Sequence, residues 1–252
     1  MKIIEALRIE KGDAIAIVGA GGKTSLLFAL AGALLKPVCL TTTTKLMFEE
    51  GHLASEHVLF PDFESSIAKN IDSTKTILIT NPQNSTGKKW LGLSPAEVDH
   101  VMSCCRQKDV TCLIEADGAR HLSLKAPADW EPVIPDKVDL VIVVVGLSAL
   151  GKPLDPKTVF RPEIFSQLTG LPFGETIRLE HVLKMLTHPK GGLKDIPSNS
   201  RAAIVFNQAD SYSINTQELA LINHALNDRF FGAILTCLQK DPDLCEVISN
   251  FD

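Results

Sequence analysis

The 252-residue sequence predicts an α/β fold with a central, mainly parallel sheet. Several strand-like segments, such as 14–18 and 140–145, are continuously apolar, which is typical of parallel strands covered on both faces. Candidate helices lie between these segments, and strands alternating with helices are typical of α/β proteins. A glycine-rich turn follows the first strand, as it does in three-layer folds that bind nucleotides. We therefore expect one phosphate-loop NTPase-like domain over residues 1–252.

The expected elements follow one another along the whole chain. Strands are predicted at 14–18, 38–42, 76–80, 111–115, 140–145, 202–206 and 232–236. Helices are predicted at 24–36, 62–70, 94–107, 161–168, 180–186, 216–228 and 241–249. Residues 81–93 contain Asn-Pro and Ser-Thr-Gly, so we expect a hairpin or an irregular insertion there. Residues 122–137 carry three prolines, which predict an irregular segment.

Composition narrows the classes of partner. The formal net charge is −5 and no long Lys/Arg run occurs, so we expect no polymeric nucleic-acid partner. The longest apolar runs are too short to span a bilayer, and the N-terminus lacks the apolar core of a signal peptide. We therefore expect a cytoplasmic protein without a membrane partner. The six cysteines show no CxxC spacing, and the histidines form no HxxxH pair, so no zinc site is predicted.

The glycine-rich turn is the strongest functional signal. It runs from Gly19 to Ser25 as Gly-Ala-Gly-Gly-Lys-Thr-Ser, between an apolar strand and an apolar helix. This layout is typical of a phosphate-binding loop, here in the short G-x-x-G-K-[ST] form. Glycines let backbone N–H groups approach phosphate oxygens, and the helix N-terminus favours negative charge. The residues expected to hold the nucleotide here are Gly19, Gly21, Gly22, Lys23, Thr24 and Ser25.

Carboxylates and hydroxyls at two other strand ends predict a magnesium site. Glu115 and Asp117 end the strand at 111–115, where an acidic side chain typically holds Mg²⁺ or its water. Thr43 belongs to the run Thr-Thr-Thr-Thr-Lys that follows the second strand and ends at Lys45. Open parallel sheets bind ligands at the carboxyl ends of their strands. We expect Thr24, Asp117 and Thr43 to ligate the metal, with Glu115 as the alternative carboxylate.

Three further groups complete the predicted site. Asn207 and Asp210 follow the strand at 202–206 as Asn-Gln-Ala-Asp, which resembles the N-K-x-D element that recognises guanine in GTPases. A strand-ending turn rich in Asn and Asp explains the same residues, so the base stays open between ATP and GTP. Arg161 lies at a helix start, and Lys125 lies in the proline-rich segment. Both are expected to face an anionic second substrate.

Several motifs together resemble the YqeC family, whose members are identified as selenium-dependent hydroxylase accessory proteins. The motifs are the glycine-rich turn, Thr-Thr-Thr-Thr-Lys at 41–45, Glu-Ala-Asp-Gly-Ala at 115–119, Leu-Lys-Ala-Pro at 124–127, Glu-Pro-Val-Ile-Pro at 131–135, Val-Gly-Leu-Ser-Ala-Leu-Gly-Lys-Pro at 145–153, Phe-Arg-Pro-Glu at 160–163 and Asn-Gln-Ala-Asp at 207–210. The resemblance implies a phosphate-loop-like fold and a role in maturing selenium-dependent molybdenum hydroxylases, with such a hydroxylase or its cofactor as the partner.

The residues and the resemblance lead to one main functional hypothesis and two alternatives. The main hypothesis is an Mg²⁺-dependent nucleoside triphosphatase or phosphotransferase that assists this maturation. Lys23, Glu115, Asp117, Lys125 and Arg161 are then the expected catalytic residues, because phosphoryl transfer needs positioning and positive charge. The first alternative is a nucleotide-gated assembly factor without significant turnover. The second is a Mur-like ATP-dependent ligase, suggested by the short loop.

Overall fold

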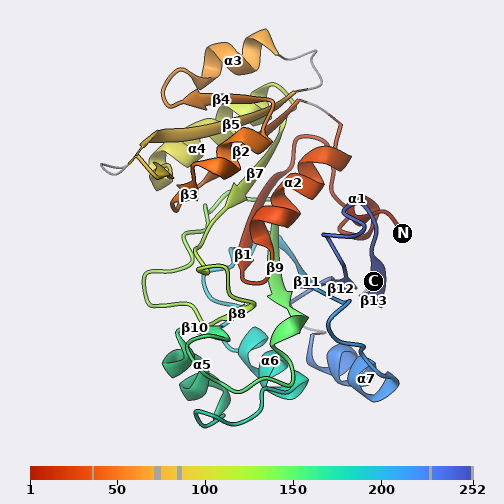
Figure 1. The fold of residues 1–252 in the computed structure, drawn as a ribbon. Coiled ribbons are helices and arrows are strands. Elements are labelled where there is room, and N and C mark those ends of the chain that lie inside the picture. The colour runs from red at the N-terminus through yellow and green to blue at the C-terminus, as the bar shows by residue number, and fades with distance from the viewer. Residues whose placement is uncertain (36, 71–74, 84–86, 227–228, 251–252) are drawn as a thin grey trace.

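The computed structural model describes residues 1–35, 37–70, 75–83, 87–226 and 229–250. Within these ranges the main sheet has eleven strands in the order β13-β12-β11-β9-β1-β7-β2-β5-β6-β3, with β4 paired to β5 (Figure 1). β1 (Ala14–Gly19) lies near the centre, between β9 (Leu140–Gly146) and β7 (Thr111–Glu115). Its buried residues match the continuously apolar segment that predicted this strand.

Most of the sheet is parallel. The parallel pairs join β1, β7, β9 and five further strands: β2 (Val38–Thr42), β4 (Glu56–Leu59), β5 (Thr76–Gln83), β11 (Arg201–Asn207) and β12 (Gly232–Leu235). The antiparallel strands at the two edges are β3 (Leu46–Met47), β6 (Lys89–Leu91) and β13 (Glu246–Asn250). A separate parallel pair consists of β8 (Leu124–Lys125) and β10 (Val159–Phe160). The carboxyl ends of the central parallel strands therefore meet at one edge of the sheet.

Helices cover both faces of the sheet, which confirms the predicted three-layer α/β architecture. Alternate residues of β1 point to opposite faces: Ile15 and Ile17 pack with α2, whereas Ala14 and Ala16 pack with α4. The first face is covered by α1 (Ile3–Ala6) and α2 (Lys23–Ala33). The second face is covered by α3 (Phe63–Lys69), α4 (Pro95–Gln107), α5 (Pro162–Thr169), α6 (Leu179–Leu186) and α7 (Thr216–Ala225).

Helix starts differ in how their backbone N–H groups are satisfied. At α4 the Ser94 side chain accepts from the Glu97 N–H, and the Glu97 carboxylate accepts from the Ser94 N–H. Asn215 and Glu218 form the same kind of capping box at α7. By contrast, α2 starts after Gly22 without any side-chain cap. The N-terminus of α2 at the sheet edge therefore keeps N–H groups that a ligand can use.

One predicted element is wrong and several short ones were not predicted. The expected helix at 241–249 is instead the strand β13, which pairs antiparallel with β12. β-branched Val247 and Ile248 suit a strand at this sheet edge. The excursion expected at 81–93 is confirmed, because β5 continues to Gln83 and pairs antiparallel with β6; residues 84–86 lie outside the described ranges. Sequence analysis missed α1, β3, β4, β6, β8 and β10.

The other predicted helices are present, with ends that agree with the prediction or differ from it by a few residues. α2 ends at Ala33 because Leu34 is already extended, and Pro37 follows two positions beyond Leu35. The predicted ends at residues 36 and 228 lie outside the described ranges. The segment 122–137 contains only the two residues of β8 in regular structure, as its prolines predicted. No helix in the described part of the chain is long and apolar enough to cross a membrane.

Candidate active site at the carboxyl edge of the sheet

The glycine-rich loop between β1 and α2 is packed tightly against two neighbouring strands. Gly21 and Gly22 have φ angles of +85° and +126°, which residues other than glycine rarely adopt. A Cβ on Gly21 would lie 2.3 Å from the backbone nitrogen of Gly146, at the end of β9. A Cβ on Gly22 would lie 2.3 Å from Nδ2 of Asn207, at the end of β11. Both positions therefore require glycine for close approach.

The loop uses its first N–H groups internally and leaves later ones for a ligand. The Gly19 N–H donates to the Asp117 carboxylate, the Ala20 N–H to the Val144 carbonyl and the Gly21 N–H to the Leu122 carbonyl. The N–H groups of residues 23–25 form the first turn of α2, where no carbonyl precedes them within the helix. These N–H groups and the partial positive charge of the helix end make this turn suited to an anion.

Lys23 lies at the start of α2 and is only 5% exposed. Its Nζ donates to the Gly19 carbonyl at 2.9 Å and lies 3.3 Å from Asp117 Oδ1 and 3.7 Å from Glu115 Oε1. Burial alone would lower the pKa of Lys23, but the two carboxylates outweigh burial and the pKa is raised. Lys23 is therefore a positive charge held in place between two acidic side chains.

Glu115 and Thr24 bring oxygen atoms together next to Lys23, and the Thr43 backbone lies against that of Glu115. The Thr24 hydroxyl donates to Glu115 Oε2 at 3.0 Å, and the Thr43 N–H donates to the Glu115 carbonyl at 3.0 Å. Burial raises the pKa of Glu115, although Lys23 and the Thr24 hydroxyl oppose this rise. The hydroxyl oxygen of Thr43 is buried and has no hydrogen-bond partner. A buried hydroxyl without a partner is costly, so this atom is suited to a ligand.

This oxygen set fits Mg²⁺ by its chemistry. Mg²⁺ prefers oxygen ligands and is usually held by one or two carboxylates together with waters and substrate phosphates. Glu115, Thr24 and the unpartnered Thr43 hydroxyl offer such atoms. Within the residues that the structure describes, no group of three or more His, Cys, Asp and Glu side chains is arranged to hold a metal ion.

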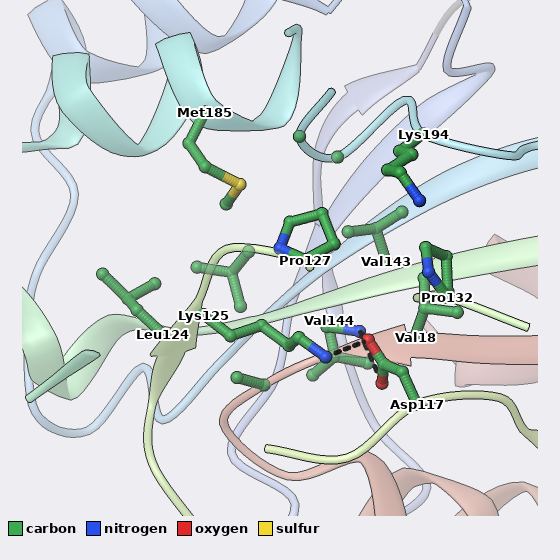
Figure 2. A pocket seen from close by; sticks show the side chains of 15 residues that line it. Val18, Asp117, Leu124, Lys125, Pro127, Pro132, Val143, Val144, Met185 and Lys194 are labelled. Carbon is green, nitrogen blue, oxygen red and sulfur yellow. Dashed lines mark hydrogen bonds and ion pairs between the residues drawn. The ribbon is translucent and has the colours of Figure 1, made fainter. Parts of the chain in front are cut away.

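Asp117 lies two residues beyond Glu115 but has different surroundings. It is 2% exposed, and its carboxylate accepts from the Gly19 N–H and pairs with Lys23 and with Lys125, the latter at 2.8 Å. Asp117 and Lys125 line a small cavity of about 30 Å³ together with Pro127 and Met185. Figure 2 shows the Asp117 carboxylate and the Lys125 ammonium meeting there. The structure thus places Asp117 beside the glycine-rich loop but in an enclosed cluster.

Lys125, Glu131 and Arg161 continue this cluster toward the surface. Glu131 Oε2 lies 2.8 Å from Lys125 Nζ and 2.7 Å from a terminal nitrogen of Arg161. Burial would raise the pKa of Glu131, but its bonds to Arg161 and Lys125 outweigh burial and the pKa is lowered. The Arg161 guanidinium also lies over the Phe160 ring, 4.1 Å from its centroid. Alternating charges therefore run without a break from Lys23 to Arg161.

A large cleft opens at the carboxyl edge, with a volume of about 1110 Å³. Residues 21–25, Thr43 and Glu115 line it, so most of the predicted nucleotide and metal residues share one space, whereas Gly19 lines the small cavity. Lys125, Asp117 and Arg161 do not line it, whereas Lys45 does. Sequence reasoning missed Arg120 and His121, which line the cleft with positive φ angles of +50° and +61°. Their only signal in the sequence is their place just after the acidic strand end.

Asn207 and Asp210 lie on the far side of the cleft from Glu115. Asn207 Nδ2 donates to the Gly21 carbonyl at 2.8 Å, and its Oδ1 accepts from the Leu238 N–H at 3.2 Å. Asn207 therefore braces the glycine loop against the turn after β12. Asp210 lines the cleft near its rim and lies 3.4 Å from Lys240. Both are in the same cleft as the glycine loop, as the predicted nucleotide site requires.

Comparison with known proteins identifies relatives of this chain. Residues 15–163 match a family model described as YqeC protein. A protein of Escherichia coli (strain K12), with the name "Uncharacterized protein YqeC", is 32% identical over 197 residues, which cover 77% of this chain and 75% of the relative. No solved structure matches. The family match includes the glycine loop, Glu115, Asp117 and Arg161, whereas Asn207 and Asp210 lie beyond it.

Proposed function

The chain belongs to the YqeC protein family, and from that premise we propose that it binds a nucleoside triphosphate with Mg²⁺ in the cleft at the carboxyl edge. The triphosphate lies on the first turn of α2, and Glu115 and Thr43 lie on the γ-phosphate side. The bound nucleotide is hydrolysed or donates a phosphoryl group. A bound state without turnover, as in an assembly factor, is the alternative.

One observation carries the proposal. The uncapped N-terminus of α2, the Lys23 ammonium and the unpartnered Thr43 hydroxyl all lie around one cleft. Each of these groups favours an oxygen-rich anion or a cation bound with it. The volume of about 1110 Å³ leaves room for a nucleotide and a further molecule.

Binding requires Lys23 to change partners. Its ammonium is engaged by Gly19, Asp117 and Glu115, as described above. The β- and γ-phosphates offer it charged oxygen partners, and the terminal γ-phosphate carries up to two negative charges. Asp117 keeps Lys125 and the Gly19 N–H when Lys23 moves, so its charge stays compensated. Glu115 keeps only the Thr24 hydroxyl, so it is the carboxylate that gains most from a new cation.

We propose that Glu115, Thr24 and Thr43 hold the Mg²⁺, directly or through water. The ion shields the charge of the phosphates and aligns them. The chain's own contribution is to fix the triphosphate on α2 and to hold Lys23 beside the position where negative charge develops. Lys45 and Arg120 line the same cleft and bring positive charge for an anionic second substrate. Lys125 and Arg161, expected in that role, lie in the enclosed cluster instead.

We further propose that the client is a selenium-dependent molybdenum hydroxylase or its cofactor. This part is supported by the motifs at 115–119 and 131–135, which resemble the corresponding YqeC motifs and border the site. Turnover that accelerates only when the client is present would favour the assembly-factor alternative. Turnover that depends on an amine cosubstrate would favour a ligase.

Calorimetric titration of the purified protein with ATP and GTP, each with and without Mg²⁺, tests the proposal. We expect binding that depends on Mg²⁺ and that weakens about tenfold or more in Lys23→Ala, since the lost contact is charge-assisted. The control is Lys69→Ala, an exposed lysine in α3 that removes the same charge away from the cleft.

Stability must be measured beside affinity, because Lys23 is buried between two carboxylates. We expect Lys23→Ala to unfold more easily without ligand, by about 3 kcal/mol. Thr24→Val is the milder second variant, which keeps Lys23 and removes one hydroxyl. Equal affinity in wild type, Lys23→Ala and Thr24→Val would contradict the proposal.

A further inference from the structure

The two ends of the cleft differ in chemistry, and the difference orients the nucleotide. Glu115 and Thr43 follow β7 and β2, which lie on one side of β1. Asn207 and Asp210 follow β11, which lies on the other side of β1, beyond β9. With the metal-binding oxygens on the β7 side, the terminal phosphate points there. The sugar and the base then extend across β9 toward β11. β11 lies two strand spacings, or about 10 Å, from β1.

The β11 end of the cleft is built as a rigid wall. Asn207 Nδ2 donates to the Gly21 carbonyl, while its Oδ1 accepts from the Thr236 hydroxyl and the Leu238 N–H, both at 3.2 Å. All of these bonds are buried, so this side chain ties three segments together. The segment that follows is thereby fixed relative to the phosphate-binding loop.

The turn after Asn207 presents one acidic side chain to this end of the cleft. Gln208 has a φ of +65°, the Ala209 N–H donates to the Thr236 carbonyl, and the Ser211 N–H donates to the Gln208 carbonyl. Asp210 is at the rim of this turn. A second observation points to a ligand here: Gln208 also lines the cleft, and its Oε1 is buried without a hydrogen-bond partner.

We infer that Asp210 recognises a guanine base, so that the triphosphate of the proposed function, on which this inference rests, is GTP. A carboxylate has two oxygens that only accept hydrogen bonds. Guanine offers two adjacent donors on one edge, N1–H and the N2 amino group. Adenine offers one donor beside an unprotonated ring nitrogen, which the carboxylate repels. A site built for two such donors rejects the base that lacks them.

The charge state of Asp210 agrees with this role. A hydrogen bond from the Cys237 thiol, followed by the Lys240 ammonium, lowers the pKa of Asp210, so its carboxylate is ionised at neutral pH. Cys237 lines the same end of the cleft, and Lys240 lies beyond it. The bland explanation is an exposed ion pair between Asp210 and Lys240, which is usually worth little and selects no base.

Calorimetric titration with GTP, ATP and xanthosine triphosphate (XTP), all with Mg²⁺, separates these explanations. For the wild type we expect GTP to bind at least about tenfold more tightly than ATP. In Asp210→Asn, the amide presents one acceptor and one donor, which match N1–H and the O2 carbonyl of xanthine. We therefore expect GTP to lose about tenfold or more in affinity and XTP to bind at least as well as GTP.

The matched control is Asp241→Asn, which removes the same charge from an exposed aspartate that does not line the cleft. It should keep the order of the wild type. Equal affinity for GTP and ATP that still depends on Lys23 would overturn the guanine inference and leave the proposed function standing. The same holds if Asp210→Asn keeps the wild-type order of the three nucleotides. Absence of binding by all three would overturn both.

Discussion

Glu115 and Asp117 are two carboxylates only two residues apart, and both lie beside Lys23, yet they have opposite surroundings. Glu115 faces the large cleft and has one hydroxyl and one distant ammonium as partners. Asp117 faces the small cavity and has two lysines and a backbone N–H. Burial raises the pKa of Glu115, because its partners do not offset the loss of water. The carboxylate in the cleft, Glu115, thus has too few partners to balance its charge, whereas both oxygens of Asp117 in the enclosed cluster are engaged.

The difference suggests a division of labour between the two regions. A buried charge with too few partners destabilises the folded protein. Such charges are typically found at functional sites, where a bound ligand offsets the loss of water. A carboxylate whose oxygens are all engaged stabilises the structure that surrounds it. Asp117 connects the glycine loop, through Lys125, with Glu131 and Arg161. The enclosed cluster therefore holds the glycine loop in place, and the cleft is where we expect a ligand to bind.

The largest effect should separate the two carboxylates directly. We expect Asp117→Asn to lower the free energy of unfolding by about 3 kcal/mol, because it leaves two buried lysines with one fewer counter-charge. We expect Glu115→Gln to leave this free energy unchanged or to raise it, since burial opposes the charge of Glu115. Urea unfolding of both variants without ligand measures the difference.

The same pair should behave in the opposite way toward ligand. Glu115→Gln should weaken Mg²⁺-dependent nucleotide binding about tenfold, because it removes a negative oxygen near the metal. Asp117→Asn should change affinity less, once it is measured at a temperature where the variant is folded. If the two variants lose stability and affinity to the same extent, the division of labour is wrong.

The sequence predicted which residues gather at this edge of the sheet better than it predicted the different surroundings of Glu115 and Asp117. Lys23, Thr24 and Glu115 belong to local patterns, a glycine-rich loop and an acidic strand end, and these need no knowledge of the fold. The different roles of Glu115 and Asp117 could not be predicted, because alternation along a strand places both on one side. The side chains that separate them are Lys125, which pairs with Asp117, and Thr24, which bonds Glu115; Lys125 reaches Asp117 only through the path of the irregular segment 122–137.

Two other misses have different physical origins. Arg120 and His121 line the cleft because of positive φ angles, which their residue types do not signal. The segment 241–249 has no strong pattern of its own, and pairing with the open edge of β12 makes part of it the strand β13. Strand pairing decided the second case, and an uncommon local backbone conformation decided the first. The seven predicted strands are long and apolar, and the structure has a strand at each of them.

A smaller effect should come from Glu131, in the enclosed cluster. We expect Glu131→Gln to lose about 2 kcal/mol of stability at pH 7, because two charge-assisted bonds are weakened. The folded pKa of Glu131 is lowered from 4.5, so its contribution is complete above that value and is lost as the pH falls through the lowered folded pKa. The difference between wild type and variant should therefore shrink in acid.

Chemical unfolding from pH 7 downward measures this difference. The control is Glu163→Gln, which changes an exposed glutamate in α5 and should show no such trend. Nucleotide affinity at pH 7 should stay within a few fold of the wild type, since Glu131 lines the cleft but its carboxylate is paired with Lys125 and Arg161. A pH-independent difference would mean that the charge of Glu131 does not stabilise the fold.

The smallest effect should come from Thr43, which lines the cleft and whose buried hydroxyl has no hydrogen-bond partner. Thr43→Val keeps the shape and removes that oxygen. Because the hydroxyl forms no bond in the unliganded protein, its loss should leave the melting temperature unchanged or slightly higher. Mg²⁺-dependent nucleotide binding should weaken about fivefold, the equivalent of about 1 kcal/mol, whereas binding without Mg²⁺ should not change.

Thr41→Val is the matched control, because the Thr41 hydroxyl donates to the Ile79 carbonyl within the sheet and faces no ligand. It should lower the melting temperature and leave the effect of Mg²⁺ intact. The opposite pattern, a less stable Thr43→Val with unchanged metal dependence, would remove Thr43 from the metal site and leave Glu115 and Thr24 to hold the ion.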